Sequence, residues 1–131
     1  MKKAYLAIGL QNRKLLEAET AIIRETLLSL QIHLIIFVDA YHFGTGQEKE
    51  MMQAAFHEID HCDLLLAEVS EKAIGVGIEI GYAVAKQKPV IYLRKADAEH
   101  STTAAGSAAE QIIYQNGADL AEKLINTLQA R

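Results

Sequence analysis

A single carboxylate lies within a run of small and apolar residues. Glu79 is the only charged side chain from residue 73 to residue 85. A helix over residues 73–85 that is apolar nearly all round is expected to be buried. Burying a carboxylate in such a helix costs several kcal/mol unless donors or a partner offset it. In the first or second turn of a helix, free backbone N–H groups and the helix dipole favour a negative charge. A carboxylate held ionised beside an apolar pocket has the chemistry of a nucleophile toward the anomeric carbon of a sugar.

Gly75 and Gly77 precede this carboxylate. They remove side chains from the predicted helix start, so a ligand can approach backbone N–H groups that suit an oxygen-rich or anionic molecule. A structural interpretation stays open, in which the glycines only allow close packing on a sheet and Glu79 caps its helix or pairs with a base. The dinucleotide fingerprint does not fit, because it requires a glycine-rich turn after the first strand, where the chain reads Gly9-Leu10-Gln11-Asn12.

Apolar runs and stretches with helical spacing follow one another along the chain and indicate the strands and helices that position these residues. Apolar runs predict strands at 5–8, 33–38, 63–69, 90–93 and 111–114, and helical spacing predicts helices at 12–30, 48–61, 73–85 and 118–128. Residues 96–109 are expected to form a loop or a weak helix. The central runs are continuously apolar, as in strands covered on both faces. Right-handed crossovers then predict one α/β domain over residues 1–131, with a doubly wound, mostly parallel five-stranded sheet.

Such sheets bind ligands beyond the carboxyl ends of their strands, near the point where strand order reverses. Gly9 and Ser70 follow the first and third predicted strands, and both are candidate binding residues together with the glycines at 75 and 77. Tyr41 and Phe43 lie on the loop after the second strand. Their rings suit stacking on a flat base, although an ordinary surface loop is also compatible with them.

Composition restricts the class of protein. The net charge of -4 argues against a nucleic-acid partner, which would require a basic face. No uncharged apolar segment reaches the roughly 20 residues of a membrane span. The single cysteine, Cys62, cannot form an internal disulfide, which fits a reducing compartment. We therefore expect a soluble cytoplasmic protein without a membrane partner.

A metal-site motif needs a separate interpretation. His57-Glu58-Ile59-Asp60-His61 matches the H-E-x-x-H pattern of zinc proteases. The apolar positions of this helix predict that His57 and His61 face solvent, away from a closed cleft, and no third ligand is evident. Metal-dependent hydrolysis is thus a minor hypothesis, and no metal or cofactor is expected.

The segment from Cys62 to Leu93 resembles the nucleoside 2-deoxyribosyltransferase family and its 2′-deoxynucleoside 5′-phosphate N-hydrolase relatives. The resemblance is centred on the G-x-G-x-E-x-G-Y segment from Gly75 to Tyr82. It implies a flavodoxin-like fold, a homo-oligomer and a nucleoside or nucleotide substrate. It also implies that Glu79 is a nucleophile forming a covalent deoxyribosyl intermediate, that Tyr5 helps to hold Glu79 or the sugar, and that Gln111 contacts the base.

Two positions depart from the family pattern. Ala55 stands where the transferases carry a sugar-binding aspartate. Ala73 stands where they carry another aspartate and the phosphate-specific hydrolases a serine, which weakens the case for a 5′-phosphate substrate. The alternatives are a different substrate, replacement by other polar groups, or a non-catalytic nucleoside- or nucleotide-binding module. The candidate replacements are Glu68, Glu71, Asp39 and Gln11.

Overall fold

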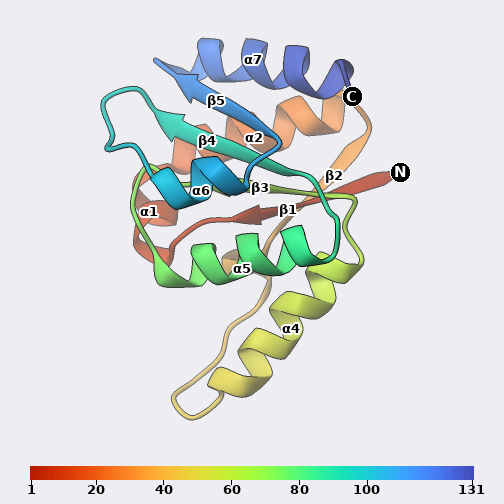
Figure 1. Cartoon of the computed structure of the whole chain (residues 1–131), viewed down its shortest axis with the longest axis vertical. Helices are drawn as coiled ribbons and strands as arrows, with labels where there is room; N and C mark the ends of the chain where they lie inside the picture. Colours follow the sequence, from red (N-terminus) through yellow and green to blue (C-terminus); the bar gives the residue numbers. More distant parts are fainter.

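A parallel five-stranded sheet forms the centre of the computed structural model, which describes residues 1–131. The strand order is β2-β1-β3-β4-β5, and every neighbouring pair is parallel (Figure 1). The strands are β1 (Lys2–Ala7), β2 (Ile32–Ile36), β3 (Leu64–Glu68), β4 (Val90–Lys95) and β5 (Glu110–Tyr114). The predicted doubly wound α/β fold is confirmed.

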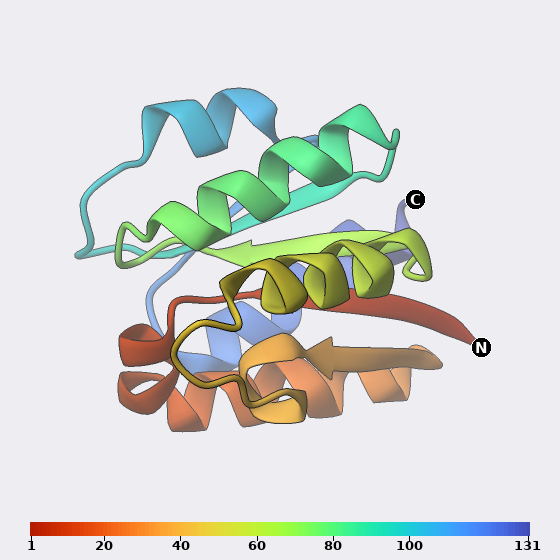
Figure 2. The ribbon, with the colours of Figure 1, turned by 90° about the horizontal axis from the view of Figure 1, so that it is seen from below.

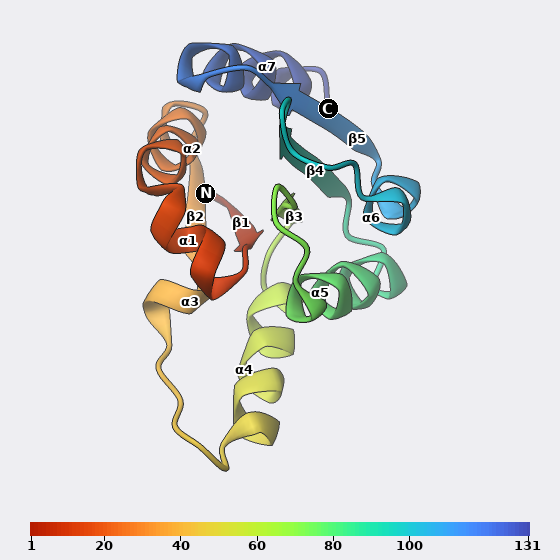
Figure 3. The ribbon, with the colours of Figure 1, turned by 90° about the vertical axis from the view of Figure 1, so that its left-hand side faces the viewer.

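Helices cover both faces of the sheet. Helices α2 and α7 pack on one face, and α4, α5 and α6 lie on the other (Figure 3). The helices are α1 (Leu10–Leu15), α2 (Glu17–Ser29), α3 (Phe37–Ala40), α4 (Glu48–Asp60), α5 (Ile74–Ala85), α6 (Thr102–Ser107) and α7 (Gly117–Gln129). None of them combines the length and the apolar character needed to cross a membrane.

Two hydrophobic cores result from the alternation of side chains along each strand. In β3, all five residues are buried. Leu64 and Leu66 join the core beneath α2 and α7. Leu65 and Ala67 join the core beneath α4 and α5. A strand buried on both faces needs apolar side chains in both directions, which explains the continuous apolar run in the sequence.

Two local predictions differ from the structure. The helix predicted at 12–30 is two helices, because the backbone at Leu16 leaves helical geometry with φ -109° and ψ 41°. The second strand ends at Ile36, since residues 37–40 turn into the short helix α3. For residues 96–109, where a loop or a weak helix was expected, the structure has the short helix α6 at 102–107, in agreement with the second alternative.

The prediction that α5 is buried nearly all round is wrong for the isolated chain. Val76, Ile80 and Ala83 face the sheet and are buried. Ile74 and Ile78 are 86% and 48% exposed on the other side. The apolar sequence of α5 therefore serves an outward surface as well as the core.

The carboxyl ends of β1 and β3 form the point where the chain turns to opposite faces. From β1 the chain continues into α1 and α2, and from β3 it continues into α5 on the other face (Figures 1 and 3). Gly9 follows β1, and a Cβ atom there would lie 3.1 Å from Cβ of Ala73. A residue without a side chain thus allows the β1–α1 turn to approach the start of α5.

Candidate active site

Tyr5 and Glu79 meet on the α5 side of the sheet. Tyr5 is fully buried in β1, and its hydroxyl donates a hydrogen bond to Oε2 of Glu79. Glu79 is half-buried and is the sixth residue of α5. A central strand and a packed helix are rigid supports, so this contact fixes the carboxylate between a core side chain and the cavity described below.

The pKa of the Glu79 carboxyl group lies near neutral pH. Burial raises the pKa of Glu79 to about 7, although the hydrogen bond from Tyr5 acts in the opposite direction. Burial and the Glu79 charge both raise the pKa of Tyr5, so that its hydroxyl remains a donor. The prediction that backbone N–H groups at the start of α5 stabilise the charge of Glu79 is wrong. The hydrogen-bond donor to Glu79 is the side chain of Tyr5, because Glu79 lies beyond the first turn of α5.

Glu79 lines a cavity of about 400 Å³, a size within the range of small-molecule sites. The walls come from the β1–α1 turn, from the segment between β2 and α4, from α4 and from the start of α5. Its lining residues are Ile8, Gly9, Leu10, Phe37, Val38, Tyr41, His42, Phe43, Met51, Met52, Ala55, Ala73, Gly75, Val76 and Glu79.

Aromatic side chains form one wall of this cavity. The rings of Tyr41 and Phe43 are 6° from parallel with centroids 6.0 Å apart. Phe37 stacks on Tyr41 at 4.8 Å, and also lies 6.0 Å from Tyr5. The segment 41–47 that carries Tyr41 and Phe43 runs from α3 to α4 (Figure 2). The wall offers flat apolar surface on which a planar heterocycle can stack.

Both departures from the family pattern lie at the cavity. Ala55 and Ala73 each contribute a methyl group to its lining. None of the four residues predicted as polar replacements lines it. Asp39 forms an ion pair with Arg13 at 2.9 Å, and the side chain of Gln11 is exposed. Glu68 is buried and accepts hydrogen bonds from Asn12 and Tyr114. Glu71 lines the neighbouring groove between α5 and α6. The space beside the alanines is therefore apolar.

The structure brings only some of the predicted binding residues to this cavity. Gly9, Gly75, Tyr41 and Phe43 line it. Ser70 does not, because its hydroxyl accepts a hydrogen bond from the backbone N–H of Lys95. Gln111 lies on β5 in a separate shallow pocket near α7, and it is not brought to the cavity.

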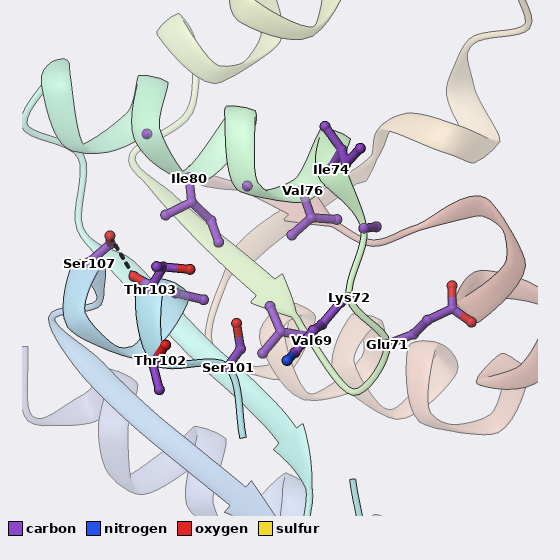
Figure 4. A pocket seen from close by; sticks show the side chains of 14 residues that line it. Val69, Glu71, Lys72, Ile74, Val76, Ile80, Ser101, Thr102, Thr103 and Ser107 are labelled. Atoms are coloured by element: carbon purple, nitrogen blue, oxygen red, sulfur yellow. Dashed lines mark hydrogen bonds between the residues drawn. The ribbon is translucent and has the colours of Figure 1, made fainter. Parts of the chain in front are cut away.

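Gly77 lines a second hollow of about 400 Å³, between α5 and α6. Figure 4 shows Ile80 and Val76 pointing into it from α5, opposite hydroxyl side chains from the α6 segment. Lys72 on its rim is paired with Glu99 at 3.0 Å. This groove contains neither Glu79 nor an aromatic wall. We therefore assign the candidate site to the cavity that contains the carboxylate.

The glycines at 75 and 77 do not serve close packing within the chain. A Cβ atom at either position would meet nothing within 4 Å. The open space beside Gly75 belongs to the cavity, so the interpretation in which a ligand approaches the helix start fits the geometry better than the packing interpretation.

His57 on α4 and His61, the residue directly after α4, are exposed, as the apolar positions of this helix predict. Their ring centroids are 4.3 Å apart, and neither residue lines the Glu79 cavity. The face of α4 opposite them carries the buried Ala55 and Ile59.

Several wall residues were not predicted from the sequence, among them Phe37, Val38 and Met51. Residues 37 and 38 were part of a predicted strand, whereas the structure starts α3 there and turns them toward the cavity. Met51 is adjacent to the predicted buried face of α4. Phe37 and Val38 are apolar residues directly after the carboxyl end of β2, and this placement is the sequence signal that could have identified them as wall residues.

A buried polar cluster lies behind this edge of the sheet. We call Glu68, Asn12, Ser70 and Tyr114 the Glu68 cluster. Oε1 of Glu68 accepts hydrogen bonds from the Ser70 backbone N–H at 2.6 Å and from Nδ2 of Asn12 at 3.2 Å. Oε2 accepts from the Tyr114 hydroxyl at 2.6 Å. The cluster joins α1, the end of β3 and the end of β5, and so fixes the loops that lead to the cavity.

The charge of Glu79 can be measured without any substrate. We expect NMR titration of its carboxyl carbon to give a midpoint near pH 7. In Tyr5→Phe the midpoint moves upward, because the hydrogen bond that lowers the pKa of Glu79 is lost. The raised native pKa stabilises the fold fully below about pH 4.5, and this contribution is lost as the pH rises through 7. A midpoint that is lower in Tyr5→Phe than in the wild type would contradict this account of the pair.

Comparison with known proteins adds a family match. The model described as nucleoside 2-deoxyribosyltransferase matches residues 4–126. Among curated proteins, the chain is 33% identical over 57 residues, 44% of its length, to the 5-hydroxymethyl-dUMP N-hydrolase of Branchiostoma floridae. It is 48% identical over 48 residues, 37% of its length, to a protein of Syntrophotalea carbinolica named as a 2′-deoxynucleoside 5′-phosphate N-hydrolase. The matches span 54% and 34% of these relatives' own lengths.

Solved structures share the fold over nearly the whole chain. The CMP N-glycosidase of Clostridium botulinum superimposes with a TM-score of 0.73 at 19% identity, covering 96% of this chain and 99% of that one. A 2-deoxyribosyltransferase of Bacillus psychrosaccharolyticus gives 0.74 at 16% identity, covering 96% and 95%. At these identities the likeness establishes the fold alone.

Proposed function

Since the chain belongs to the nucleoside 2-deoxyribosyltransferase family, we propose that it is an enzyme that cleaves or transfers at the N-glycosidic bond of a (deoxy)nucleoside or nucleotide. Glu79 is the proposed nucleophile, and a covalent glycosyl-Glu79 intermediate is the central feature of the mechanism. The relatives named above as N-hydrolases, an N-glycosidase and a deoxyribosyltransferase support this class of chemistry.

The proposed reaction has two displacements. In the first, a carboxylate oxygen of Glu79 bonds to the anomeric carbon, and the bond from that carbon to the base nitrogen breaks. The base leaves with the electron pair and takes up a proton from solvent. In the second, water or another base attacks the same carbon, and the bond to Glu79 breaks. Water completes hydrolysis, and a base completes transfer.

The observation that carries the proposal is the Glu79 carboxylate itself. It lies at a cavity large enough for a nucleoside, and the Tyr5 hydroxyl holds it in place. Its pKa of about 7 leaves about half of the Glu79 carboxyl groups ionised at pH 7, and the apolar surroundings leave the carboxylate weakly solvated. In the proposed mechanism Tyr5 is the positioning group for the nucleophile.

Covalent trapping tests this proposal. A 2′-fluoro-2′-deoxynucleoside slows breakdown of a glycosyl ester, because fluorine destabilises the oxocarbenium-like transition state. We expect intact-protein mass spectrometry to show one added fluorosugar and peptide mapping to place it on Glu79. Glu79→Gln is the matched control and is expected to carry no adduct. A label on another residue, or no label under conditions where base is released, would refute the glycosyl-Glu79 intermediate.

A second candidate is a non-catalytic nucleoside- or nucleotide-binding module of the same fold. The alanines at 55 and 73 favour it, because both leave an apolar surface beside the nucleophile. In this case the ligand raises the melting temperature of wild type and of Glu79→Gln alike, and neither adduct nor free base forms.

We propose further that the protein works as a homo-oligomer in the cytoplasm, without a nucleic-acid partner. The exposed Ile74 and Ile78 on α5 support self-association, since large apolar residues gathered on one helix mark contact surfaces. The net charge of -4 supports the absence of a nucleic-acid partner.

Sedimentation measures the predicted association. We expect the wild type to sediment as a species larger than the 14.4 kDa chain. Ile78→Asp should shift it toward monomer, because a charge is costly to bury in an interface. The control is Leu28→Asp, which charges a residue on α2 that is 56% exposed on the opposite face of the sheet. Monomeric wild type, or equal dissociation in both variants, would contradict an α5 interface.

A further inference from the structure

Two imidazole side chains at the carboxyl end of α4 form a pair that the proposed reaction does not use. His57 lies in the last turn of α4, and His61 is the residue that caps this helix. The backbone N–H of His61 donates to the carbonyl oxygen of His57 at 3.3 Å, so the chain remains helical between them. Residues four apart in a helix lie on the same face. Both side chains are exposed on that face, outside the Glu79 cavity.

The spacing of the two rings is close to that of a metal chelate. Their centroids are 4.3 Å apart, and their planes are tilted by 44°. Two imidazole rings that share a metal ion at about 2.0–2.1 Å from each nitrogen have centroids roughly 4.5 to 5 Å apart. A small rotation of the side chains covers the difference, because both are exposed. The pair can therefore bind one ion without a change in the backbone.

A hydrogen bond prepares His61 as a ligand. Its Nδ1 lies 2.8 Å from the carbonyl oxygen of His57. A carbonyl oxygen only accepts, so Nδ1 carries a proton and Nε2 of the neutral ring keeps its lone pair. Histidine ligands commonly donate their other ring N–H in this way, which fixes the tautomer and the orientation of the ring. His61 thus has Nε2 available to a metal ion.

The end of the helix also favours a cation. Carbonyl groups in the last turn of a helix carry partial negative charge, which attracts positive charge to this end. An ion held by His57 and His61 would lie beside the last turn of α4, a helix of 13 residues. The helix dipole therefore adds to the attraction that the two imidazole nitrogens provide.

The acidic residues between the two histidines have other partners. Oε1 of Glu58 accepts a hydrogen bond from the Tyr41 hydroxyl at 3.1 Å. Oδ1 of Asp60 accepts one from the Tyr82 hydroxyl at 2.8 Å. No third histidine, cysteine, aspartate or glutamate completes a cluster with the imidazole pair. The arrangement therefore differs from a zinc-protease site, which needs a third ligand and a free glutamate base.

We propose that His57 and His61 form a two-ligand surface site for a divalent transition-metal ion, with water in the remaining coordination positions. Imidazole nitrogens suit Cu²⁺, Ni²⁺ and Zn²⁺, whereas Mg²⁺ and Ca²⁺ prefer oxygen ligands. The bound ion bridges the last turn of α4 and stabilises it. This inference is independent of the proposed function, because neither histidine lines the Glu79 cavity.

Calorimetric titration of the whole chain with Cu²⁺, Ni²⁺ or Zn²⁺, in a buffer that does not bind metals, measures this site. We expect one ion per chain, with Cu²⁺ bound most tightly, as at nitrogen sites in general. His57→Gln and His61→Gln each leave one imidazole, and loss of the chelate should weaken Cu²⁺ binding by about tenfold or more. The matched control is His33→Gln, which removes an exposed histidine from β2. It should change the affinity by less than about twofold.

Two further readouts identify the ligands and the effect on stability. Electron paramagnetic resonance with one equivalent of Cu²⁺ should show coupling to two imidazole nitrogens in the wild type and to one in either variant. The ion should raise the melting temperature of the wild type and of His33→Gln, because a ligand that binds the native state stabilises it. It should have no such effect when His57→Gln and His61→Gln are combined. Without metal, all these proteins should melt alike, since the substituted side chains are exposed.

Three results would overturn the proposal. Equal Cu²⁺ affinity of the wild type and either single variant would show that the two rings do not act together. Equal weakening in His33→Gln would show uptake by exposed histidines in general. One ion for every two chains would indicate a bridge between copies in place of a site on a single helix.

Discussion

Glu79→Gln is expected to lower kcat/KM for base release by at least about a thousandfold, which is the scale of loss when a catalytic nucleophile is removed. Glutamine has nearly the same shape, and its amide oxygen can still accept the hydrogen bond from Tyr5. The cavity therefore keeps its form, while the neutral amide lacks the charge needed to attack an anomeric carbon. Chromatographic detection of free base from a panel of deoxynucleosides measures the effect.

The matched control for this variant is Glu122→Gln. Glu122 is exposed on α7, on the face of the sheet opposite the candidate site. Its substitution is expected to change kcat/KM by less than about threefold, as for a charge that touches no reacting atom. Equal loss of activity in both variants would indicate a general electrostatic effect. Equal activity of Glu79→Gln and wild type would remove Glu79 from the mechanism.

Glu68→Ala is expected to give the largest loss of stability among single substitutions near the site, about 3 kcal/mol or more in the free energy of unfolding. The carboxylate accepts three hydrogen bonds, and its removal leaves two buried side-chain donors and one backbone N–H without a partner. Burial also raises the pKa of Glu68 while these three donors lower it, so donors and carboxylate depend on each other. Urea unfolding measures the difference.

Two variants calibrate this result. Tyr114→Phe removes one hydrogen bond of the Glu68 cluster and is expected to cost about 1 to 2 kcal/mol. Glu122→Ala removes an exposed carboxylate on α7 and should change the free energy of unfolding by less than about 0.5 kcal/mol. A cost for Glu68→Ala as small as that for Glu122→Ala would mean that water replaces the carboxylate in the cluster.

Much of the fold follows from periodicity, because buried strands and amphipathic helices leave strong patterns. Continuous apolar runs identified β3 and its neighbours, and their order along the chain predicted the parallel sheet. Local backbone changes are weaker signals. The break at Leu16 and the end of β2 at Ile36 are changes in backbone conformation that no single residue type marks.

The candidate site was predictable in part. Glu79 stands out because it is one charge in an apolar helix, and Tyr5 entered through the family resemblance. Their hydrogen bond joins residues 74 positions apart, so it becomes visible only with the tertiary structure. Gln111 shows the limit of the resemblance outside residues 62–93, since β5 lies at the edge of the sheet away from the cavity.

The burial of α5 was predicted wrongly for a physical reason. An apolar helix is compatible with a core on all sides or with a surface that another molecule covers, and a sequence pattern does not distinguish the two. The exposed Ile74 and Ile78 decide in favour of an outward apolar face in the single chain.

The carboxylate and the walls of the cavity come from parts of the chain with different freedom to vary. Tyr5 belongs to an inner strand, whereas Tyr41, Phe43 and Met52 come from residues 41–52 at the periphery. In the proposed enzyme, exchange of that peripheral stretch between related proteins would change which base is accepted and leave the Tyr5–Glu79 pair undisturbed. Base preference and reactivity would then be separable, with residues 41–52 as the part to redesign.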